Sequence, residues 1–384
     1  MSHSHDIFLD HASTTPLHPD AMGVMLPYFG FHYGLPAANS GLGARSLNAF
    51  TAARAGVAAL IHAQDQQIVF TSGGTEANNL AILGTAAACG RKKGHIITSV
   101  IEHASIAGAC RHLERQGFRV TALPVGRDAT ISPLAVEQAA CEDTLLISIM
   151  HASHVTGTLQ PVSEIGAFAR SRGIPFHVDA SQSAGKTAID VNALGADLMT
   201  ISGHKLYGPK GTGALFIRDP SLLEPLFFGT GIQHPFRPGT MNLPGIVALG
   251  MACSVALKDL DTAGPAMAHL RDLLEKLVQD LVEGVTVLAG YCPRLPHITT
   301  LTFDRVPADS LARFLAGAGL SSLPIGPLDD PEGLGPTLDA LTAKHGHPFG
   351  ALRLSVGWEN TENEMNKAAE LIRKGVSRIR ASLE

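Results

Sequence analysis

The chain has 384 residues and a formal net charge of -5, with 45% hydrophobic and only 16% charged residues. This length indicates a large domain with a smaller companion, each able to bury its own core. An acidic balance without a basic patch argues against nucleic acid or an anionic membrane as a partner, so small molecules are the expected ligands. The 40 glycines and 23 prolines are spread along the whole chain, which is typical of a loop-rich α/β enzyme and not of a disordered protein.

The N-terminal sequence MSHSHDIF lacks the basic and apolar segments of a signal peptide, and uninterrupted apolar runs such as LLISIM are far shorter than a membrane span. We therefore expect a cytoplasmic protein. The cysteines form no CxxC pair and show no metal-ligand spacing, so we expect reduced, mostly buried thiols and no metal site. They are Cys89, Cys110, Cys141, Cys253 and Cys292.

From Gln67 onward, short β-branched runs alternate with helical patterns. This alternation predicts a mostly parallel sheet covered by helices on both faces. The predicted strands are IVFTS, HIITSV, LLISIMHA, FHVDA, LMTIS and ALFIR, and the predicted helices lie in TEANNLAILGTAAAC, around CRHLER and in VSEIGAFARSRG. We assign residues 16–255 to this large domain and expect residues 1–15 to pack on the small domain.

Residues 256–384 are expected to form an α+β companion domain. Helical patterns cover residues 266–281 and the segment DSLARFLAGAG, and strands are predicted at VTVLA, ITTLTF and LRLSV. A last helix opens at Thr361, where Glu364 three residues on completes a capping-box pattern.

Three motifs of the large domain follow predicted strands, which is where an open parallel sheet binds ligands. In TSGGTEANNLAI, the amides of Gly74 and Thr75 and the dipole of the next helix can cradle an anion, although a glycine turn with a threonine cap explains the pattern equally well. In VDASQ, Asp179 can hold a ring nitrogen protonated and Gln182 can reach a ring substituent, with an ordinary capping aspartate as the alternative. In SGHKLYGPKG, a single lysine, Lys205, stands among glycines that allow close backbone approach.

A phosphate cradle, a carboxylate for a pyridine nitrogen and a lysine for a Schiff base are the parts that a pyridoxal phosphate site needs. The chain resembles the fold-type I pyridoxal phosphate enzymes of the class V aminotransferase family, and among them the cysteine desulfurases. The motifs run from LDHASTTPLHP through FTSGGTEANNLAI, IEHASI, HVDASQSAGK, SGHKLYGPKG and PGTMNLP to LRLSVG. The resemblance implies a large α/β domain with a mostly parallel seven-stranded sheet, a smaller α+β C-terminal domain, and a homodimer with a shared active site.

The resemblance also implies a role for each matching residue. Lys205 would form the Schiff base and move protons at the substrate's α and β carbons, and His103 would stack on the cofactor ring and take part in proton transfer. Arg353 would clamp the substrate carboxylate, a task suited to its two-pronged guanidinium. The remaining cofactor contacts implied are Gly74, Thr75, Asp179, Gln182, Ser202 and His204, with Thr240 supplied by the partner subunit.

The sequence departs from the desulfurase pattern near the substrate. Desulfurases carry a nucleophilic cysteine on a loop before the strand that bears the arginine, but residues 319–353 contain no cysteine and the family's SSGSAC reads SSLPIGP. The family's MHVNNEIG reads MHASHVTG, which puts Ser153 where an asparagine near the ring oxygen is expected. His154 follows as a candidate substrate contact, with a structural histidine as the alternative.

These features predict a pyridoxal phosphate enzyme that cleaves the C–S bond of cysteine or a cysteine derivative. Without the loop thiol, Lys205 can remove the α proton while a leaving group departs from the β carbon, giving pyruvate and ammonia. One alternative is a class V aminotransferase on a small amino acid, which would consume an added keto acid. Another is a non-catalytic scaffold of a sulfur-transfer complex, which would not need Lys205 with Asp179. A sulfur acceptor protein is a further expected partner if desulfurase chemistry survives.

Overall fold

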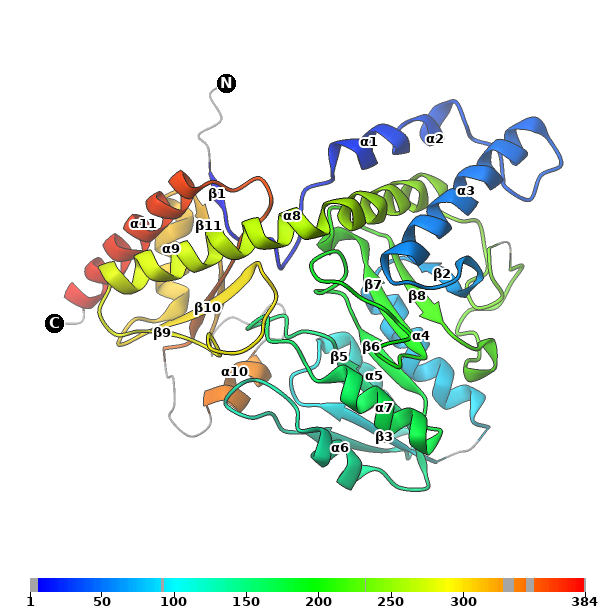
Figure 1. The fold of residues 1–384 in the computed structure, drawn as a ribbon, viewed down its shortest axis with the longest axis horizontal. Coiled ribbons are helices and arrows are strands. Elements are labelled where there is room, and N and C mark those ends of the chain that lie inside the picture. Colours follow the sequence, from blue (N-terminus) through cyan, green and yellow to red (C-terminus); the bar gives the residue numbers. More distant parts are fainter. Residues whose placement is uncertain (1–5, 91–92, 232, 327–334, 343–348, 383–384) are drawn as a thin grey trace.

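The computed structural model describes residues 6–90, 93–231, 233–326, 335–342 and 349–382. The molecule is elongated, with a large unit and a small unit connected by one long helix, α8 (Leu243–Leu281), which contributes to both (Figure 1).

The large unit is built on a seven-stranded sheet with the strand order β2-β8-β7-β6-β5-β3-β4. Six strands are parallel to one another, and only β8 runs antiparallel to its two neighbours. This confirms the expected mostly parallel α/β fold. The strands are β2 (Ile68–Thr71), β3 (His95–Ser99), β4 (Arg119–Leu123), β5 (Thr144–Met150), β6 (Phe176–Asp179), β7 (Leu198–Ser202) and β8 (Gly213–Ile217).

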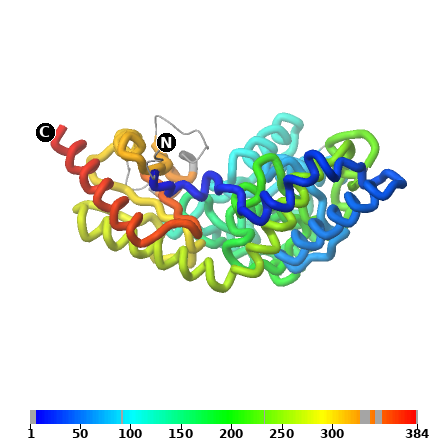
Figure 2. Tube along the Cα trace, turned by 90° about the horizontal axis from the view of Figure 1, so that it is seen from above, coloured from blue at the N-terminus to red at the C-terminus, as the bar shows by residue number. Residues whose placement is uncertain are grey.

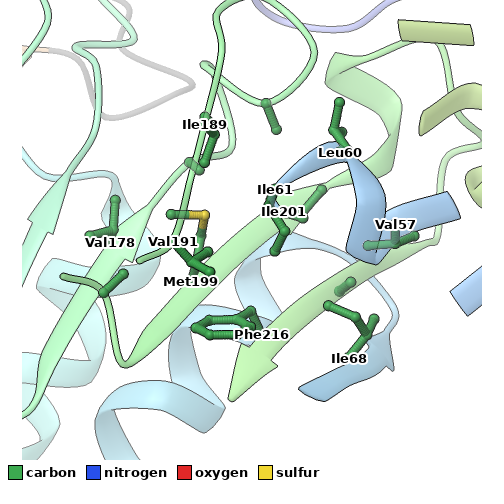
Figure 3. Close-up of a cluster of buried hydrophobic side chains, with 14 of the residues drawn as sticks. Val57, Leu60, Ile61, Ile68, Val178, Ile189, Val191, Met199, Ile201 and Phe216 are labelled. Carbon is green, nitrogen blue, oxygen red and sulfur yellow. The ribbon is translucent and has the colours of Figure 1, made fainter. Parts of the chain in front are cut away.

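Helices cover both faces of this sheet, because nearly every strand is apolar on both sides. One face packs against α4 (Gly74–Ala88) and α5 (Ala104–Arg115). The other packs against α3 (Gly41–Leu60), α6 (Pro133–Ala139), α7 (Val162–Arg172) and the first half of α8. In the core on this second face of the sheet, Phe216 and Ile201 of the sheet lie with Val57 of α3 (Figure 3). Two short helices, α1 (Pro19–Met25) and α2 (Pro27–Gly30), complete the unit beside α8.

The small unit contains a four-stranded antiparallel sheet with the order β12-β13-β10-β9. Its core is closed by the second half of α8 together with α9 and α11. At the start of α11, Thr361 and Glu364 form the predicted capping box. The elements are β9 (Val285–Val287), β10 (Ile298–Phe303), α9 (Ala308–Gly317), β12 (Leu323–Ile325), α10 (Gly335–Thr342), β13 (Ala351–Ser355) and α11 (Glu362–Ala381).

The long helix corrects one expectation and bears on a second. The helix expected over residues 266–281 begins at Leu243 and continues through Pro265, because burial of both of its ends outweighs the one backbone hydrogen bond that proline removes. The predicted domain boundary at residues 255/256, which stays a prediction, therefore falls inside a continuous helix.

By length and composition alone, α8 is also apolar enough to cross a membrane, with a mean hydropathy of 1.5 over its best 18-residue window. The length of the uninterrupted apolar runs in the sequence did not indicate this property of α8. In that window 44% of the residues are buried, and Ile246 and Leu249 belong to the core of the large unit. One core helix of this kind is weak evidence for a membrane span.

The N-terminal segment links the two units. Strand β1 (Ile7–Phe8) pairs in parallel with β11 (Leu320–Ser321) of the small unit. The chain then crosses to the large unit, where the Thr15 amide donates to the His204 carbonyl at 2.9 Å. Figure 2 shows this segment running along the molecule from the end where both termini lie.

Candidate active site

A cavity of about 880 Å³ lies where β5, β6 and β7 end. The parallel strands bring Met150, Asp179 and Ser202, their last residues, to one edge of the sheet, and all three line the cavity. The N-termini of α4 and α5 open onto the same space, and Ser13 and Thr14 of the N-terminal segment close it from the side of the small unit.

The first turn of α4 forms one wall of the cavity. Gly73 precedes the helix with φ +152°, a conformation that favours glycine. A Cβ on Gly74 would lie 3.0 Å from the Ser181 hydroxyl and 3.3 Å from Ser202 Cβ, so only glycine lets these segments approach so closely. Thr75 follows at the exposed mouth. The free backbone amides of a helix N-terminus beside Ser202 are suited to an anion such as phosphate.

Asp179 is buried at the end of β6 and is oriented by two donors. Asn78 of α4 donates Nδ2–H to Asp179 Oδ2 at 2.8 Å, and the Ser181 amide donates to Oδ1 at 2.9 Å. The same Asn78 amide group donates to Ser105 Oγ at 2.9 Å, and this hydroxyl lies 2.8 Å from His103 Nδ1. One hydrogen-bonded network therefore connects Asp179 to His103.

Lys205 and Gln182 converge on one backbone atom. Lys205 Nζ donates to the Ala12 carbonyl at 2.6 Å and to the Ser13 carbonyl at 2.7 Å. Gln182 Nε2 donates to the same Ala12 carbonyl at 2.9 Å. Lys205 ends the short 3-10 turn Gly203–Lys205 after β7, so the strand and the N-terminal segment together hold its amine at the cavity.

Arg353 of β13 lies directly behind this wall and is fully buried. Its Nη2 donates to Ser13 Oγ at 2.6 Å and to Asp10 Oδ1 at 3.2 Å, and its Nη1 donates to the His154 carbonyl at 2.8 Å. Ser13 thus joins Lys205, through its carbonyl, to Arg353, through its hydroxyl. Arg353 does not itself line the cavity, since Ser13 and His154 stand in front of it.

His154 presents a neutral ring to the cavity. It is buried, and among the described residues its Nε2 has no hydrogen-bond partner. Burial first, and then the charges of His103, Arg353 and Lys205, hold its pKa well below the usual value. Its ring lies 5.9 Å from that of His103 in an edge-to-face arrangement. A buried polar atom without a partner, in a residue that lines a cavity, is a candidate for a ligand contact.

Besides Arg353, two of the expected site residues do not line the cavity. Ser153 is buried and does not line the cavity, because its Oγ accepts the Val155 and Thr156 amides within the turn. The neighbouring His154 occupies the wall instead. Thr240 is exposed on the segment before α8 and also lies outside the cavity lining. Its assignment to a partner's site stays a prediction. His204 does line the cavity, with its Nδ1 3.1 Å from Thr14 Oγ1.

Three residues that position the site were missed from the sequence. They are Asn78, Ser13 and Glu102. The signal for Asn78 was its place one helical turn after Thr75. Glu102 directly precedes His103; its Oε1 accepts the Ser99 hydroxyl at 2.6 Å and the Met150 amide at 3.1 Å. Burial raises the pKa of Glu102 to about 8.

No cysteine reaches the cavity. All five are in the described part of the chain as free thiols, and none lines it. Within the described ranges, no group of three or more His, Cys, Asp or Glu side chains is arranged to hold a metal ion.

The cavity fits pyridoxal phosphate. The close approach at Gly74 leaves helix amides for the phosphate, the oriented Asp179 carboxylate suits a pyridine nitrogen, and Lys205 supplies the amine. His154 also lines the cavity, and its buried Nε2 has no hydrogen-bond partner among the described residues.

Fold and site together define a fold-type I pyridoxal phosphate enzyme. The chain belongs to the class V aminotransferase family, since the family's sequence profile, Aminotransferase class-V, matches residues 7–367. Enzymes of this family depend on pyridoxal phosphate.

Three similar proteins show the breadth of the match. The chain is 38% identical to "Cysteine desulfurase IscS" of Methanosarcina thermophila over 97% of this chain and 93% of that protein. It superimposes on the solved structure of a "NIFS-LIKE PROTEIN" with a TM-score of 0.90 and 29% identity, covering 97% of this chain and all of that one. For "SspA in complex with cysteine" the TM-score is 0.81 and the identity 33%, covering 92% of this chain and all of the other.

Proposed function

We propose that this protein uses pyridoxal phosphate to cleave the C–S bond of cysteine or of a cysteine derivative. The observation that carries the proposal is the single network in which Ser13 joins Lys205 to Arg353 beside the oriented Asp179. The names of the similar proteins support a sulfur-containing amino acid as substrate.

In this proposal, different residues of the cavity contact different parts of the cofactor. The amides of Gly74 and Thr75, with Ser202 and His204, would hold the phosphate. Asp179 would face the pyridine nitrogen, and Gln182 would face the ring oxygen. When bound, the cofactor supplies an electron sink for the charge left at the substrate's α carbon.

Lys205 is the group placed to move the α proton. Its Nζ donates two hydrogen bonds to the carbonyls of Ala12 and Ser13, and these contacts limit the positions that the amine can take. The His103 ring lies next to the His154 ring. Its Nδ1 contacts the Ser105 hydroxyl, which belongs to the hydrogen-bonded network of Asp179. It is therefore our candidate for proton transfer at the cofactor ring face.

Arg353 is our candidate for the substrate carboxylate. A substrate carboxylate beside Ser13 would accept the hydrogen bond that Arg353 Nη2 now donates to Ser13 Oγ. Asp10 would keep the guanidinium oriented. The guanidinium is fully buried, so its contact with a carboxylate is strong.

The missing thiol favours β-elimination over a persulfide relay. Residues 319–353 contain no cysteine, and residues 327–334 and 343–348 of that segment lie outside the described part. In elimination, Lys205 takes the α proton and the sulfur leaves the β carbon as a thiolate. With one water, a cysteine S-conjugate becomes pyruvate, ammonia and a thiol. A conjugate or a disulfide such as cystine carries a good leaving group and needs no attacking cysteine.

We further propose a homodimer in which Thr240 reaches the partner's phosphate site, and a cytoplasmic location. Thr240 is exposed and lies outside its own cavity, which is the arrangement that a shared site requires. A sulfur acceptor protein is a partner only if a thiol from elsewhere completes a desulfurase reaction.

The test is to incubate the cofactor-loaded protein with L-cysteine, L-cystine and S-benzyl-L-cysteine, and to measure the sulfide or thiol released. L-Alanine with and without 2-oxoglutarate is the matched control for transamination. Release from at least one sulfur substrate, absent in Lys205→Ala, is the expected result. Turnover that depends on the keto acid would instead indicate an aminotransferase, and a purified protein without a visible cofactor band would indicate a scaffold.

A further inference from the structure

A second cavity, of about 600 Å³, lies between the large and small units. Its floor is formed by α8, through small and apolar residues such as Ala252, Ala263 and Met267. Leu206 closes it from the large unit and Trp358 from the small unit. A volume of this size is within the usual range of small-molecule sites.

This cavity is separate from the active-site cavity, but two chain segments contribute neighbouring residues to both. The 182–186 segment begins at the active site with Gln182 and reaches the second cavity at Lys186. In the same way, Lys205 lines the first cavity and Tyr207 lines the second. Of the residues that the structure describes, none lines both cavities.

Lys186 is the unusual group in this cavity. Its side chain is only 4% exposed, and its ammonium lies 4.4 Å from the centroid of the Tyr207 ring. Burial lowers its pKa to about 8, and within the described residues no carboxylate lies close enough to offset that effect. A buried ammonium without a counter-charge is unfavourable, and a cation–π contact compensates only part of the cost.

The two histidines whose pKa values Lys186 affects supply no negative charge. The charge of Lys186 lowers the pKa of His11 and of His297, in both cases in addition to burial, so both rings are neutral near pH 7. Lys186 also borders a smaller cavity that contains Arg271 and Arg294. The contact with Tyr207, which lines only the larger cavity, places the ammonium on the larger side.

Tyr207 is held in place by hydrogen bonds at both its backbone amide and its hydroxyl. It has φ +63°, which is rare for a residue with a large side chain, and its amide donates to Thr15 Oγ1 at 2.8 Å. Its hydroxyl accepts the Trp358 amide at 3.1 Å. The aromatic face under the ammonium is thus fixed before any ligand arrives.

The mouth of the cavity carries two carboxylates. Asp259 and Glu362 lie there, and Glu362 pairs with His269 across the gap between α8 and α11 at 2.8 Å. These carboxylates repel a multiply charged anion such as a phosphate ester. An apolar interior with one ammonium at its end is complementary to an apolar body with a single negative charge.

We propose that this cavity binds a small hydrophobic monocarboxylate, with its carboxylate on Lys186 and its apolar body along α8. Such a ligand contacts Tyr207 of the large unit and Trp358 of the small unit, so its binding is coupled to the arrangement of the two units. The inference does not depend on the reaction proposed above, because binding is measured without turnover.

The test is calorimetric titration of the full-length, cofactor-loaded protein with 3-phenylpropionate. The control ligand is 3-phenylpropionamide, which has the same body without the charge. We expect saturable binding of the carboxylate, at least about tenfold tighter than that of the amide, since a charged hydrogen-bonded contact is worth at least that factor. Absence of saturable binding would overturn the proposal.

Two variants locate the site. Lys186→Met should abolish the preference for the carboxylate, and retention of the preference would mean that the carboxylate is held elsewhere, for instance at Arg353. Ala266→Phe, at an exposed position on the lining, should narrow the cavity and weaken both probes while Lys186 remains. Unchanged binding of both probes to Ala266→Phe would also contradict the assignment.

Discussion

Asn78 donates to Asp179 at 2.8 Å and to Ser105 at 2.9 Å, so one buried amide group orients two parts of the site. Asp179 lies on the pyridine side in our proposal, and Ser105 holds His103 on the ring side. A residue in the second turn of helix α4 therefore orients both the carboxylate and, through Ser105, the histidine.

Asn78→Ala should lower turnover by about 10- to 100-fold, since a hydrogen bond to a charged group contributes about 1.5–3 kcal/mol. It should also shift the pH at which the visible band of the bound cofactor titrates, which a purely structural role would not do. Asn79→Ala is the matched control, because the Asn79 side chain donates to the Thr75 carbonyl of its own helix at 2.9 Å and Asn79 does not line the cavity. Equal behaviour of the two variants would remove Asn78 from the site.

Lys205→Ala should abolish the absorbance of lysine-bound cofactor and reduce turnover by at least about 10³-fold, as expected for the group that both holds the cofactor and moves the proton. Lys210→Ala is the control, since Lys210 lines the same cavity and contacts the Thr15 carbonyl at 3.5 Å. Absorption spectra and initial rates check both. Persistence of the cofactor band in Lys205→Ala would contradict the assignment of the lysine.

The sequence predicted the fold where its pattern was strong. Strands buried on both faces, such as β6 and β7, appeared as continuous apolar runs. The edge strand β4 was missed because most of its residues are at least partly exposed, so it has no such run. The start of α8 was misplaced because Pro265 resembles a helix boundary, although packing at both ends keeps the helix continuous.

The site was predictable as far as strand ends and glycine turns define it. Contacts between distant segments were not, and the hydroxyl of Ser13 meets Arg353 across 340 residues of sequence. Ser153 and His154 show a second limit. Adjacent residues in a turn point in different directions, and a motif alone did not indicate which one faces the cavity.

His154→Ala should raise the KM for the amino acid substrate by about tenfold and leave cofactor retention unchanged, because His154 lines the cavity and its buried Nε2 has no hydrogen-bond partner among the described residues. His151→Ala is the comparison, since His151 is buried, contacts Ser183 at 2.9 Å and does not line the cavity. That variant should lower stability without changing KM. Steady-state kinetics and thermal unfolding separate the two effects, and an unchanged KM in His154→Ala would argue for a structural histidine.

Glu102→Gln should change how stability depends on pH. The pKa of Glu102 is raised to about 8 in the folded protein, above the ordinary value of 4.5, so the folded state binds more protons between these pH values. The free energy of unfolding of the wild type therefore falls as pH rises from about 5 to 9, relative to the variant, by on the order of 2–4 kcal/mol. Denaturant unfolding at both pH values checks this. A parallel dependence in the two proteins would mean that Glu102 is ionised throughout.

In the proposed reaction, the enzyme breaks a C–S bond without a cysteine of its own. The most direct measurement compares the wild type with a variant in which all five cysteines are replaced, C89S, C110A, C141S, C253A and C292S, on S-benzyl-L-cysteine. Pyruvate, alanine and the released thiol are quantified together. We predict equal amounts of pyruvate and thiol, and rates within about threefold in the two proteins, because no cysteine lines the cavity. Alanine as the product, or loss of cleavage in a folded, cofactor-loaded variant, would contradict the account.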